Sequence, residues 1–378
     1  MKNIASYDVV SKYYSYAVEY YKDTDDEIQW LPICAIPQTI IANKTLFDQY
    51  GIKVPENYEE YVQVCQQFYD KGIKPYSMDL AEDWSNQEII QAAAIGEFTS
   101  LDGIDWRNKA ETSAGEIKFD DVLWKRIFSE TSQFLKDSHF SKEDINVNIN
   151  TGTQMFVEGK SAMFHGQPTD MQKLQDQMDA ELIRIPYFSQ TSDSSFVYMF
   201  PSLNIAFNKE LEKNKEKLDT ALDVLDCMIS EQGQKLIADG SGVISLNTDV
   251  PSMMQNVPGL EEEIKDTSIY IRYSAQKSFD ASLEAVHGLL SGKMDEMQAY
   301  NAFRSAMNSK DSKEKSTVNF ENEYSILLTD TIKSILKKIN PKCAIEQIGD
   351  TTLSSAWIAA MSNGQQPSAP EDYIEVEK

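Results

Sequence analysis

Apolar residues along the chain follow two patterns that alternate. Residues 56–72 show the first pattern, because Tyr61, Val64, Cys65 and Phe68 are spaced to share one face of an amphipathic helix. Helical spacing also predicts helices at residues 7–21, 121–136, 168–177 and 217–230. Short apolar runs predict extended segments at residues 28–37, 73–80, 180–190 and 197–208. This alternation over residues 27–245 predicts an α/β fold with mostly parallel sheets flanked by helices.

Polar and glycine residues mark the ends of several elements. Asn43 can cap a short helix that Gly51 terminates. In the stretch "FVEGKSAMFHGQ" a helix ends at Gly159, because glycine readily adopts positive φ. The apolar run that follows, Ser161 to Phe164, predicts a buried strand that ends in a tight turn at Gly166. Ligands of open α/β sheets bind at the carboxyl ends of strands, so this end is a candidate for a binding site.

A tryptophan lies in the polar segment "AEDWSNQ", residues 81–87, which we expect to be a loop after a strand. Trp84 can fold back onto its own lobe as a packing residue. It can also form a flat apolar platform with polar neighbours, which suits a sugar ring whose C–H faces pack on aromatic rings. The residues alone leave both interpretations open.

Length and composition favour a folded protein of two domains. The chain has 378 residues, of which 41% are hydrophobic and 10% aromatic. No apolar run reaches the roughly 20 residues that cross a bilayer. The net charge of −25 disfavours nucleic acid, and a neutral ligand is easier to accommodate. The N-terminus lacks the features of a signal peptide, so either the protein is cytoplasmic or its export signal is absent from this chain.

No motif for catalysis, a metal or a cofactor is present. There is no catalytic triad, P-loop, dinucleotide turn or zinc-protease motif, and adjacent acids such as Glu82 and Asp83 do not by themselves form a glycosidase pair. The cysteines and histidines are widely spaced, which predicts buried thiols and no metal ligands: Cys34, Cys65, Cys227, Cys343, His139, His165 and His287. We therefore expect neither an enzyme nor a cofactor.

Four segments in a fixed order resemble the extracellular solute-binding proteins of ABC importers, the carbohydrate-binding family 1 group that includes maltose-binding protein. The segments begin with "LPICAIPQTIIANKTLFDQYGIKVP" and "FVEGKSAMFHGQPTDM" and continue with "RIPYF" and "NIAFNKELEKNKEKLDTALDVLDCMISEQGQKLIADGSGVISLN". The chain departs from the family pattern at Ala42, where a tyrosine is usual, and at Gln167-Pro168, where an aromatic often touches the ligand. The resemblance covers about residues 27–250.

The resemblance implies a type II periplasmic-binding-protein-like fold of two α/β lobes joined by a hinge. The expected first lobe comprises residues 1–53 and 203–248, and the second comprises residues 57–198 and about 249–364. Residues 365–378 are expected to form an acidic flexible tail. The chain starts after the strand, helix and second strand that form the middle of the family's first lobe. We therefore expect this lobe to be incomplete.

The family also implies which residues contact the ligand. We expect Trp84 to stack on the sugar, Gly166 to leave room for it, and two aromatic side chains, Phe188 and Tyr198, to line the cleft near the hinge. The expected partners of the sugar hydroxyls are Gln38, Glu82, Asp83, Gln167 and Asp170.

The resemblance implies the substrate-binding component of an ABC transporter. It would be a monomeric cell-surface lipoprotein or periplasmic protein that captures a mono- or oligosaccharide for permease subunits. Two alternatives stay open at this point. One is a carbohydrate-active enzyme that uses a carboxylate pair, and the other is a docking or orphan protein without transport function.

Overall fold

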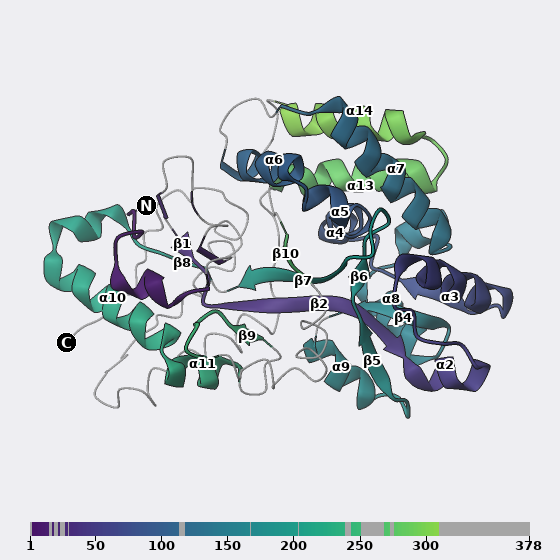
Figure 1. Cartoon of the computed structure of the whole chain (residues 1–378), viewed down its shortest axis with the longest axis horizontal. Coiled ribbons are helices and arrows are strands. Elements are labelled where there is room, and N and C mark those ends of the chain that lie inside the picture. Colours follow the sequence, from purple (N-terminus) through teal and green to yellow (C-terminus); the bar gives the residue numbers. More distant parts are fainter. Residues whose placement is uncertain are drawn as a thin grey trace. The chain divides into compact units, whose positions relative to one another are not determined.

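The fold mixes helices and strands (Figure 1), which confirms the expected α/β class. The computed structural model describes residues 2–14, 17–18, 22, 27–28, 30–112, 118–166, 168–202, 204–238, 243–250, 268–272 and 276–309. The expected acidic tail at residues 365–378 lies outside this range, as does Cys343. None of the described helices is long and apolar enough to span a membrane.

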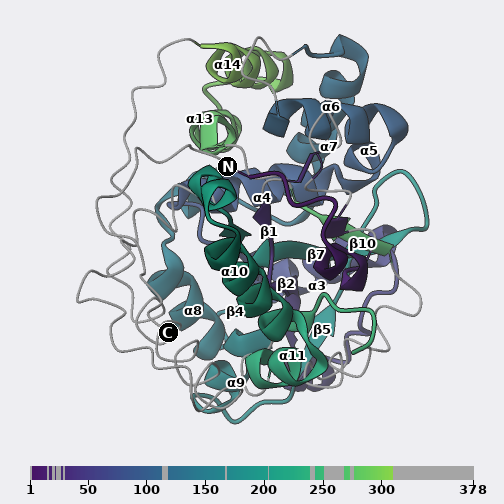
Figure 2. The same ribbon diagram turned by 90° about the vertical axis from the view of Figure 1, so that its left-hand side faces the viewer.

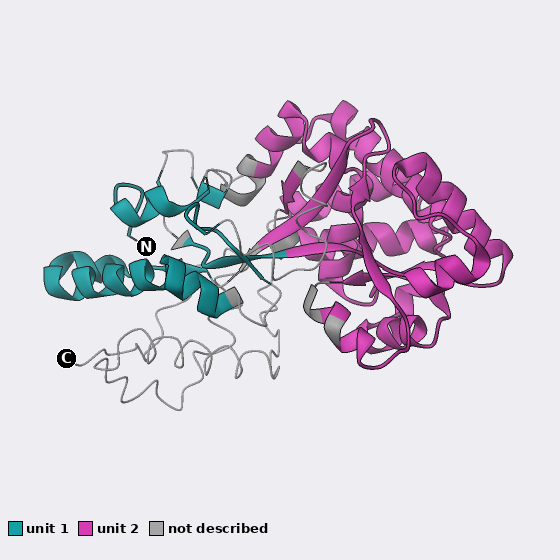
Figure 3. Ribbon diagram, turned by 60° about the horizontal axis from the view of Figure 1, so that its bottom comes forward, with its two compact units in different colours: residues 1–36, 201–256, 311–378 teal, residues 37–200, 257–310 magenta. Residues whose placement is uncertain are grey.

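The chain divides into two compact units (Figure 3). The smaller contains described residues of 1–36 and 201–256, and the larger contains those of 37–200 and 257–310. Strands β2 (Cys34–Asn43) and β7 (Ser195–Ser202) each run from one unit into the other. The expected boundary at residue 53 differs from this division. Phe47 lies 4.8 Å, ring centroid to ring centroid, from Phe68 in the core of the larger unit, so its helix belongs there.

The sheet is mixed, which corrects the expectation of mostly parallel strands. The strand order β10-β7-β2-β4-β3 joins β3 (Lys74–Ser77) to β4 (Ser161–Gly166) and β7 to β10 (Ser268–Ile271) in parallel pairs. However, β2 is antiparallel to both β4 and β5 (Leu182–Ile185), and β6 (Tyr187–Phe188) is antiparallel to β7. Strand direction depends on partners distant in sequence, which the alternation of elements does not reveal.

Helices of the larger unit cover both faces of its sheet. Side chains alternate along β2, so Ile40 and Ala42 enter the main core while Ile41 enters a second cluster with Phe156 and Phe164. The helices are α2 (Lys44–Tyr50), α3 (Tyr58–Asp70), α4 (Asp83–Ala93), α5 (Ile95–Phe98), α6 (Leu101–Thr112), α7 (Asp121–Asp137), α8 (Ile149–Val157), α9 (Pro168–Gln175), α13 (Gln276–Leu290) and α14 (Glu296–Asn308), with the 3-10 turn η2 (Asp144–Asn146). Helices α13 and α14 pack side by side (Figures 1 and 2).

Several predicted helix ends are confirmed. The Asn43 side chain accepts a hydrogen bond from the backbone of Leu46, and α2 ends at Gly51 with φ of 64°. After α8, Gly159 has φ of 67°, and β4 follows directly. Both glycines occupy the left-handed region that disfavours a side chain.

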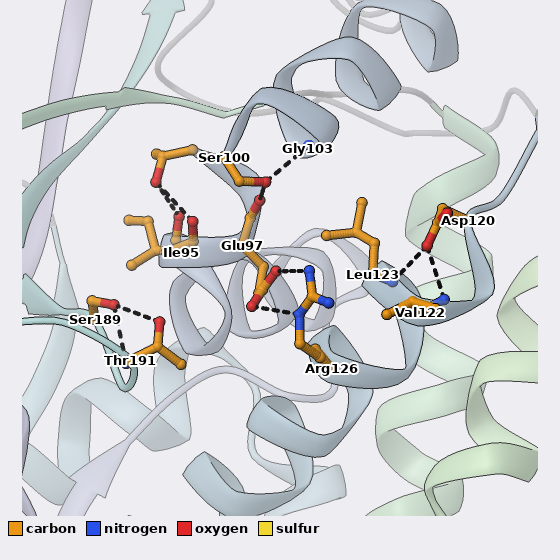
Figure 4. Close-up of polar contacts among 12 residues, drawn as sticks. Ile95, Glu97, Ser100, Gly103, Asp120, Val122, Leu123, Arg126, Ser189 and Thr191 are labelled. Carbon is orange, nitrogen blue, oxygen red and sulfur yellow. Dashed lines mark hydrogen bonds and ion pairs between the residues drawn. The ribbon is translucent and has the colours of Figure 1, made fainter.

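Helices α5 and α7 are joined by an ion pair (Figure 4). Arg126 donates two hydrogen bonds of 2.8 Å to the Glu97 carboxylate. The Asp120 carboxylate accepts backbone hydrogen bonds from Val122 and Leu123, so it caps α7 at its expected start. These local contacts fix the helices that cover the main core.

The smaller unit departs from expectation at its first element. Residues 7–21 were expected to form one helix. The described part of this range instead has the 3-10 turn η1 (Asp8–Lys12), a β-bridge from Tyr13 to Asn247, and helical backbone at residues 17–18. Tyr13 thus pairs as a strand residue does, at a position where apolar spacing predicted a helical face. The other described elements are β1 (Trp30–Leu31), β8 (Ile205–Ala206), η3 (Lys209–Lys213), α10 (Lys215–Ile229), α11 (Glu231–Ala238) and β9 (Ile244–Ser245), with α10 running into α11 (Figure 2).

Helix α4 corrects the expected loop at residues 81–87. The helix begins at Asp83 and is almost entirely buried, although five of its first six residues carry polar side chains. Distant segments supply hydrogen-bond partners for some of the buried polar side chains of this helix. Gln87 donates a hydrogen bond to Ser278 of α13, and Tyr270 of β10 donates one of 2.6 Å to Gln91. A polar sequence can therefore form a buried helix because the tertiary structure supplies its hydrogen-bond partners.

Candidate functional site

The candidate site lies in the larger unit, where the parallel strands β3 and β4 end. Ser77 pairs with Phe164 near these ends, so the chain leaves both strands at the same edge of the sheet. Asp79 and the first turn of α4 follow β3, and α9 follows β4. The segments that follow these two strands therefore start at the same edge of the sheet.

A buried group of polar side chains occupies this edge, and we name it the His165 cluster. His165, with a side chain 3% exposed, is its centre. His165 Nε2 lies 2.7 Å from a carboxylate oxygen of Glu88, and Nδ1 lies 3.1 Å from the Tyr187 hydroxyl. Arg272 forms an ion pair with the other oxygen of Glu88. The cluster consists of Gln38, Asp79, Glu88, His165, Tyr187 and Arg272.

The charges of the cluster compensate each other. Burial disfavours the His165 imidazolium, but Glu88, Asp79 and Asp170 outweigh burial, so the pKa of His165 is raised. Burial likewise disfavours the Glu88 carboxylate, but His165 and Arg272 outweigh it and lower the pKa of Glu88. Glu88 thus favours the charged form of His165, and His165 and Arg272 favour the charged form of Glu88.

Asp79 is the acidic group of the cluster whose negative charge is least balanced by its neighbours. Burial is the largest cause that raises the pKa of its carboxyl, to about 7. His165 opposes this shift, whereas Glu82, Asp170 and Glu88 add to it. One oxygen of Asp79 has no hydrogen-bond partner within the described part of the chain. Asp79 therefore changes its protonation state near neutral pH.

Three of the expected ligand residues lie around His165. The Trp84 ring lies 5.8 Å from the His165 ring, centroid to centroid, and Trp84 is half-buried in the first turn of α4. The Gln38 amide nitrogen lies 3.3 Å from His165 Nε2. Asp170 is half-buried in α9 and contributes to the electrostatics of both His165 and Asp79. The structure thus brings Gln38, Trp84 and Asp170 to one site.

The acids beside Trp84 have mainly local roles. Glu82 is the N-cap residue of α4, and its side chain makes no capping hydrogen bond. Asp83 accepts a hydrogen bond of 2.6 Å from the Trp84 backbone. The pKa of Asp83 is raised chiefly by burial, with a further contribution from Asp280. Both acids are half-buried at the edge where Trp84 lies.

The remaining expected residues have other positions. Phe188 and Tyr198 are buried in the main core, where Phe188 lines a small apolar gap with Ile40 and Tyr187. Their positions give them packing roles within the larger unit. Gly166 is buried at the end of β4, and a Cβ added there would lie 2.5 Å from the Ile41 side chain. Gln167 lies outside the described residues.

Sequence reasoning missed most of the His165 cluster. His165 was expected to be isolated, and Asp79, Glu88, Tyr187 and Arg272 were not proposed. Two local signals were available: His165 follows three apolar residues in a predicted strand, and Glu88 stands four residues after Trp84. Residues four apart share a helix face, so Trp84 and Glu88 could have been placed together only if α4 had been predicted as a helix. Within the described residues, no group of three His, Cys, Asp or Glu side chains could hold a metal ion.

The fold belongs to a known class of proteins. A family 1 extracellular solute-binding protein from Bifidobacterium longum subsp. infantis superposes with a TM-score of 0.65 at 16% identity, covering 81% of this chain and 79% of that protein. Maltose-bound MalE3 of T. maritima superposes with a TM-score of 0.60 at 12% identity, covering 81% of this chain and 79% of that protein. These matches confirm the two-lobe periplasmic-binding-protein-like fold.

The sequence assigns the family. The bacterial extracellular solute-binding protein family matches residues 2–266, so the chain belongs to this family. A "Multiple sugar-binding protein" from Streptococcus mutans serotype c is 24% identical over 148 residues, which cover 39% of this chain. The match spans about a third (34%) of the length of that curated relative. The resemblance stated from sequence motifs is therefore confirmed at the level of the family.

Proposed function

We propose that this protein captures a carbohydrate, a mono- or oligosaccharide, and delivers it to the permease of an ABC transporter. Three observations support the proposal. The chain belongs to a solute-binding family, a curated relative is named as sugar-binding, and a structure with the same fold holds maltose. The observation that carries it is the site itself, where a half-buried tryptophan stands beside an amide and several carboxyl groups. Such a combination suits a ring with apolar faces and polar edges.

In this proposal Trp84 stacks on one face of the sugar ring. Stacking on an aromatic ring contributes on the order of 1 kcal/mol beyond the burial of apolar area. Gln38, Asp83 and Asp170 accept or donate hydrogen bonds to hydroxyl groups, with Gln167 and Glu82 as further candidates. A micromolar dissociation constant requires only about −8 kcal/mol in total, so one stack and a few hydrogen bonds suffice.

Capture by a two-lobe protein needs a conformational equilibrium. We propose that the ligand shifts the protein toward the conformation that binds it more tightly, and that the permease recognises this loaded form. The protein would act outside the cytoplasmic membrane, as a monomeric cell-surface lipoprotein or periplasmic protein. It would bind its sugar without turning it over.

A ligand screen tests the proposal. Thermal shift against neutral mono- and oligosaccharides should find a stabilising sugar, and calorimetry then gives its affinity. Trp84→Ala should weaken binding at least tenfold, because the stacking surface is lost. Tyr69→Ala is the matched control, since Tyr69 is an exposed aromatic residue on α3 that stacks on His139.

Three results would contradict parts of this function. The absence of any stabilising sugar in a broad panel would argue against carbohydrate capture. Equal affinity of wild type and the Trp84 variant would remove Trp84 from the site. Release of shorter sugars from an oligosaccharide, seen by chromatography, would favour an enzyme instead.

A further inference from the structure

We propose that His165 is a positioning residue of the ligand site, which holds the side chains of Gln38 and Trp84 in place. This inference rests on the proposed function and assigns a role to a residue that would not itself need to touch the sugar. It is carried by strand register, by the partners of both ring nitrogens and by the position of Trp84.

The register of the sheet places Gln38 and His165 on one face. His165 of β4 pairs with Ile40 of β2, and opposite residues in an antiparallel pair point to the same side. Gln38 lies two residues before Ile40 on the same strand, so its side chain emerges on that side too. Ile185 of β5 also pairs with Ile40, and Tyr187 follows it by two residues. Three adjacent chain segments thus direct polar side chains to one place.

The His165 ring is held at both nitrogen atoms. Nε2 lies 2.7 Å from Glu88, and Nδ1 lies 3.1 Å from the Tyr187 hydroxyl, so rotation about χ2 would break both contacts. Glu88 is fixed in turn by Arg272. Arg272 is anchored because its backbone donates a hydrogen bond of 3.0 Å to Met199, and its guanidinium lies 4.5 Å from the centroid of the Phe200 ring. A rigid chain of contacts therefore runs from β10 to His165.

Helix α4 contacts His165 twice. Trp84 and Glu88 are four residues apart and lie on the same helix face, one turn from each other. Glu88 binds the edge of the imidazole ring, while the Trp84 ring lies against it at 5.8 Å and an angle of 39°. Trp84 is half-buried, so part of it is supported and part remains accessible to a ligand. His165 thus supports the platform that the sugar would use.

The consequence is a contribution to affinity through preorganisation. Immobilising a side chain on binding costs roughly 0.5–1.5 kcal/mol, and His165 orders two side chains before the ligand arrives. Replacing the imidazole by an apolar ring should therefore weaken sugar binding by about tenfold, with Gln38 and Trp84 themselves unchanged. The substitution also removes one partner of the buried Glu88 carboxylate, so urea unfolding of the variant is measured beside its affinity, and affinities are compared between folded proteins.

The experiment compares His165→Phe, Tyr187→Phe and Tyr58→Phe with wild type. His165→Phe keeps a ring but removes both nitrogen contacts, whereas Tyr187→Phe removes the partner of Nδ1 and leaves the Nε2 contact in place. Tyr58→Phe is the matched control, because the Tyr58 hydroxyl donates to Asp137 and makes no contact with the cluster. Calorimetry measures the dissociation constant for the sugar found in the screen. Fluorine NMR of protein labelled with 5-fluorotryptophan reports the environment of Trp84 without any ligand.

We expect a dissociation constant about tenfold higher for His165→Phe, about threefold higher for Tyr187→Phe and within twofold of wild type for Tyr58→Phe. The Trp84 resonance, assigned with Trp84→Phe, should shift or broaden in the first two variants only. Folded variants with wild-type affinity and an unchanged Trp84 resonance would overturn the inference. If His165→Phe does not fold, Tyr187→Phe decides.

The two proposals can fail separately. If wild type binds no sugar, the proposed function fails, and the Trp84 resonance in the unliganded protein still decides whether His165 positions that ring. If wild type binds a sugar while both His165 cluster variants bind it equally well with an unmoved resonance, only the positioning role fails.

Discussion

The titration of Asp79 gives a sharp prediction for the substitution Asp79→Asn. The side chain is 1% exposed, and one carboxyl oxygen has no hydrogen-bond partner in the described part of the chain. Burial raises the pKa of Asp79 from 3.8 to about 7. Asparagine has the same shape and no charge, so the substitution removes the cost of ionising this group while leaving the packing nearly unchanged.

The sign follows from proton binding in the two states. Between pH 4 and 7 the folded protein retains the Asp79 proton, whereas the unfolded chain releases it near pH 3.8. The free energy of unfolding therefore falls as the pH rises through this window and is lowest above pH 7. Above pH 7 the raised pKa of Asp79 lowers the free energy of unfolding by roughly 4 kcal/mol. At pH 5 the same relation gives a reduction of roughly 1.7 kcal/mol.

Asp79→Asn should therefore raise the free energy of unfolding by up to about 4 kcal/mol at pH 8.5. At pH 5 the increase should be smaller by about 2–3 kcal/mol. The comparison of the two pH values isolates ionisation, because any difference in shape or hydrogen bonding between the side chains acts at both. Urea unfolding followed by circular dichroism measures both values. Asp102→Asn, at an exposed position of α6, is the control for a lost negative charge.

Equal changes at both pH values would refute the reasoning. So would a variant that is less stable than wild type at pH 8.5, because Asp79 would then be a needed anion. Such a result would mean that the interaction with His165 exceeds the cost of burial.

Two further predictions concern stability. Glu88→Gln should lower the free energy of unfolding by roughly 3–5 kcal/mol at pH 7, because His165 and Arg272 lose their shared carboxylate. The loss should shrink as the pH falls through the lowered pKa of Glu88, where wild type also loses this charge; a loss that grows in acid would contradict the pairing. Asn57→Ala should cost about 1 kcal/mol, since Asn57 accepts a 2.9 Å hydrogen bond from the Glu60 backbone as the cap of α3, and urea unfolding measures it. An unchanged midpoint in that variant would show that the cap contributes nothing.

Elements with signals in neighbouring residues were predictable. The cap at Asn43, the end at Gly51 and the change from helix to strand at Gly159 depend on side chains and φ angles within a few residues. Helix α3 was predicted with its buried face, because apolar spacing alone orients it. The order of such motifs was also enough to indicate the family.

The residues that surround the site were predictable only in part. Trp84 was selected as a large aromatic residue among polar neighbours, and Asp170 was selected through the family resemblance; both follow predicted strands. Phe188 and Tyr198 were selected as aromatic residues near the hinge, but the side of the strand they face is set by the sheet, and both are buried in the core. The sequence shows which residues follow a predicted strand. The face of the sheet on which a side chain lies depends instead on the partners of its strand.

The sequence by itself determined the family, the α/β class and the local helix ends, because these depend on short-range patterns. Only the tertiary structure decided that the polar segment after β3 is a buried helix and that His165 is a centre of contacts. Glu88 and Arg272 are paired across 184 positions of the chain. A buried polar residue is stable only with its partner, and no local pattern identifies a partner that folding brings from so far away.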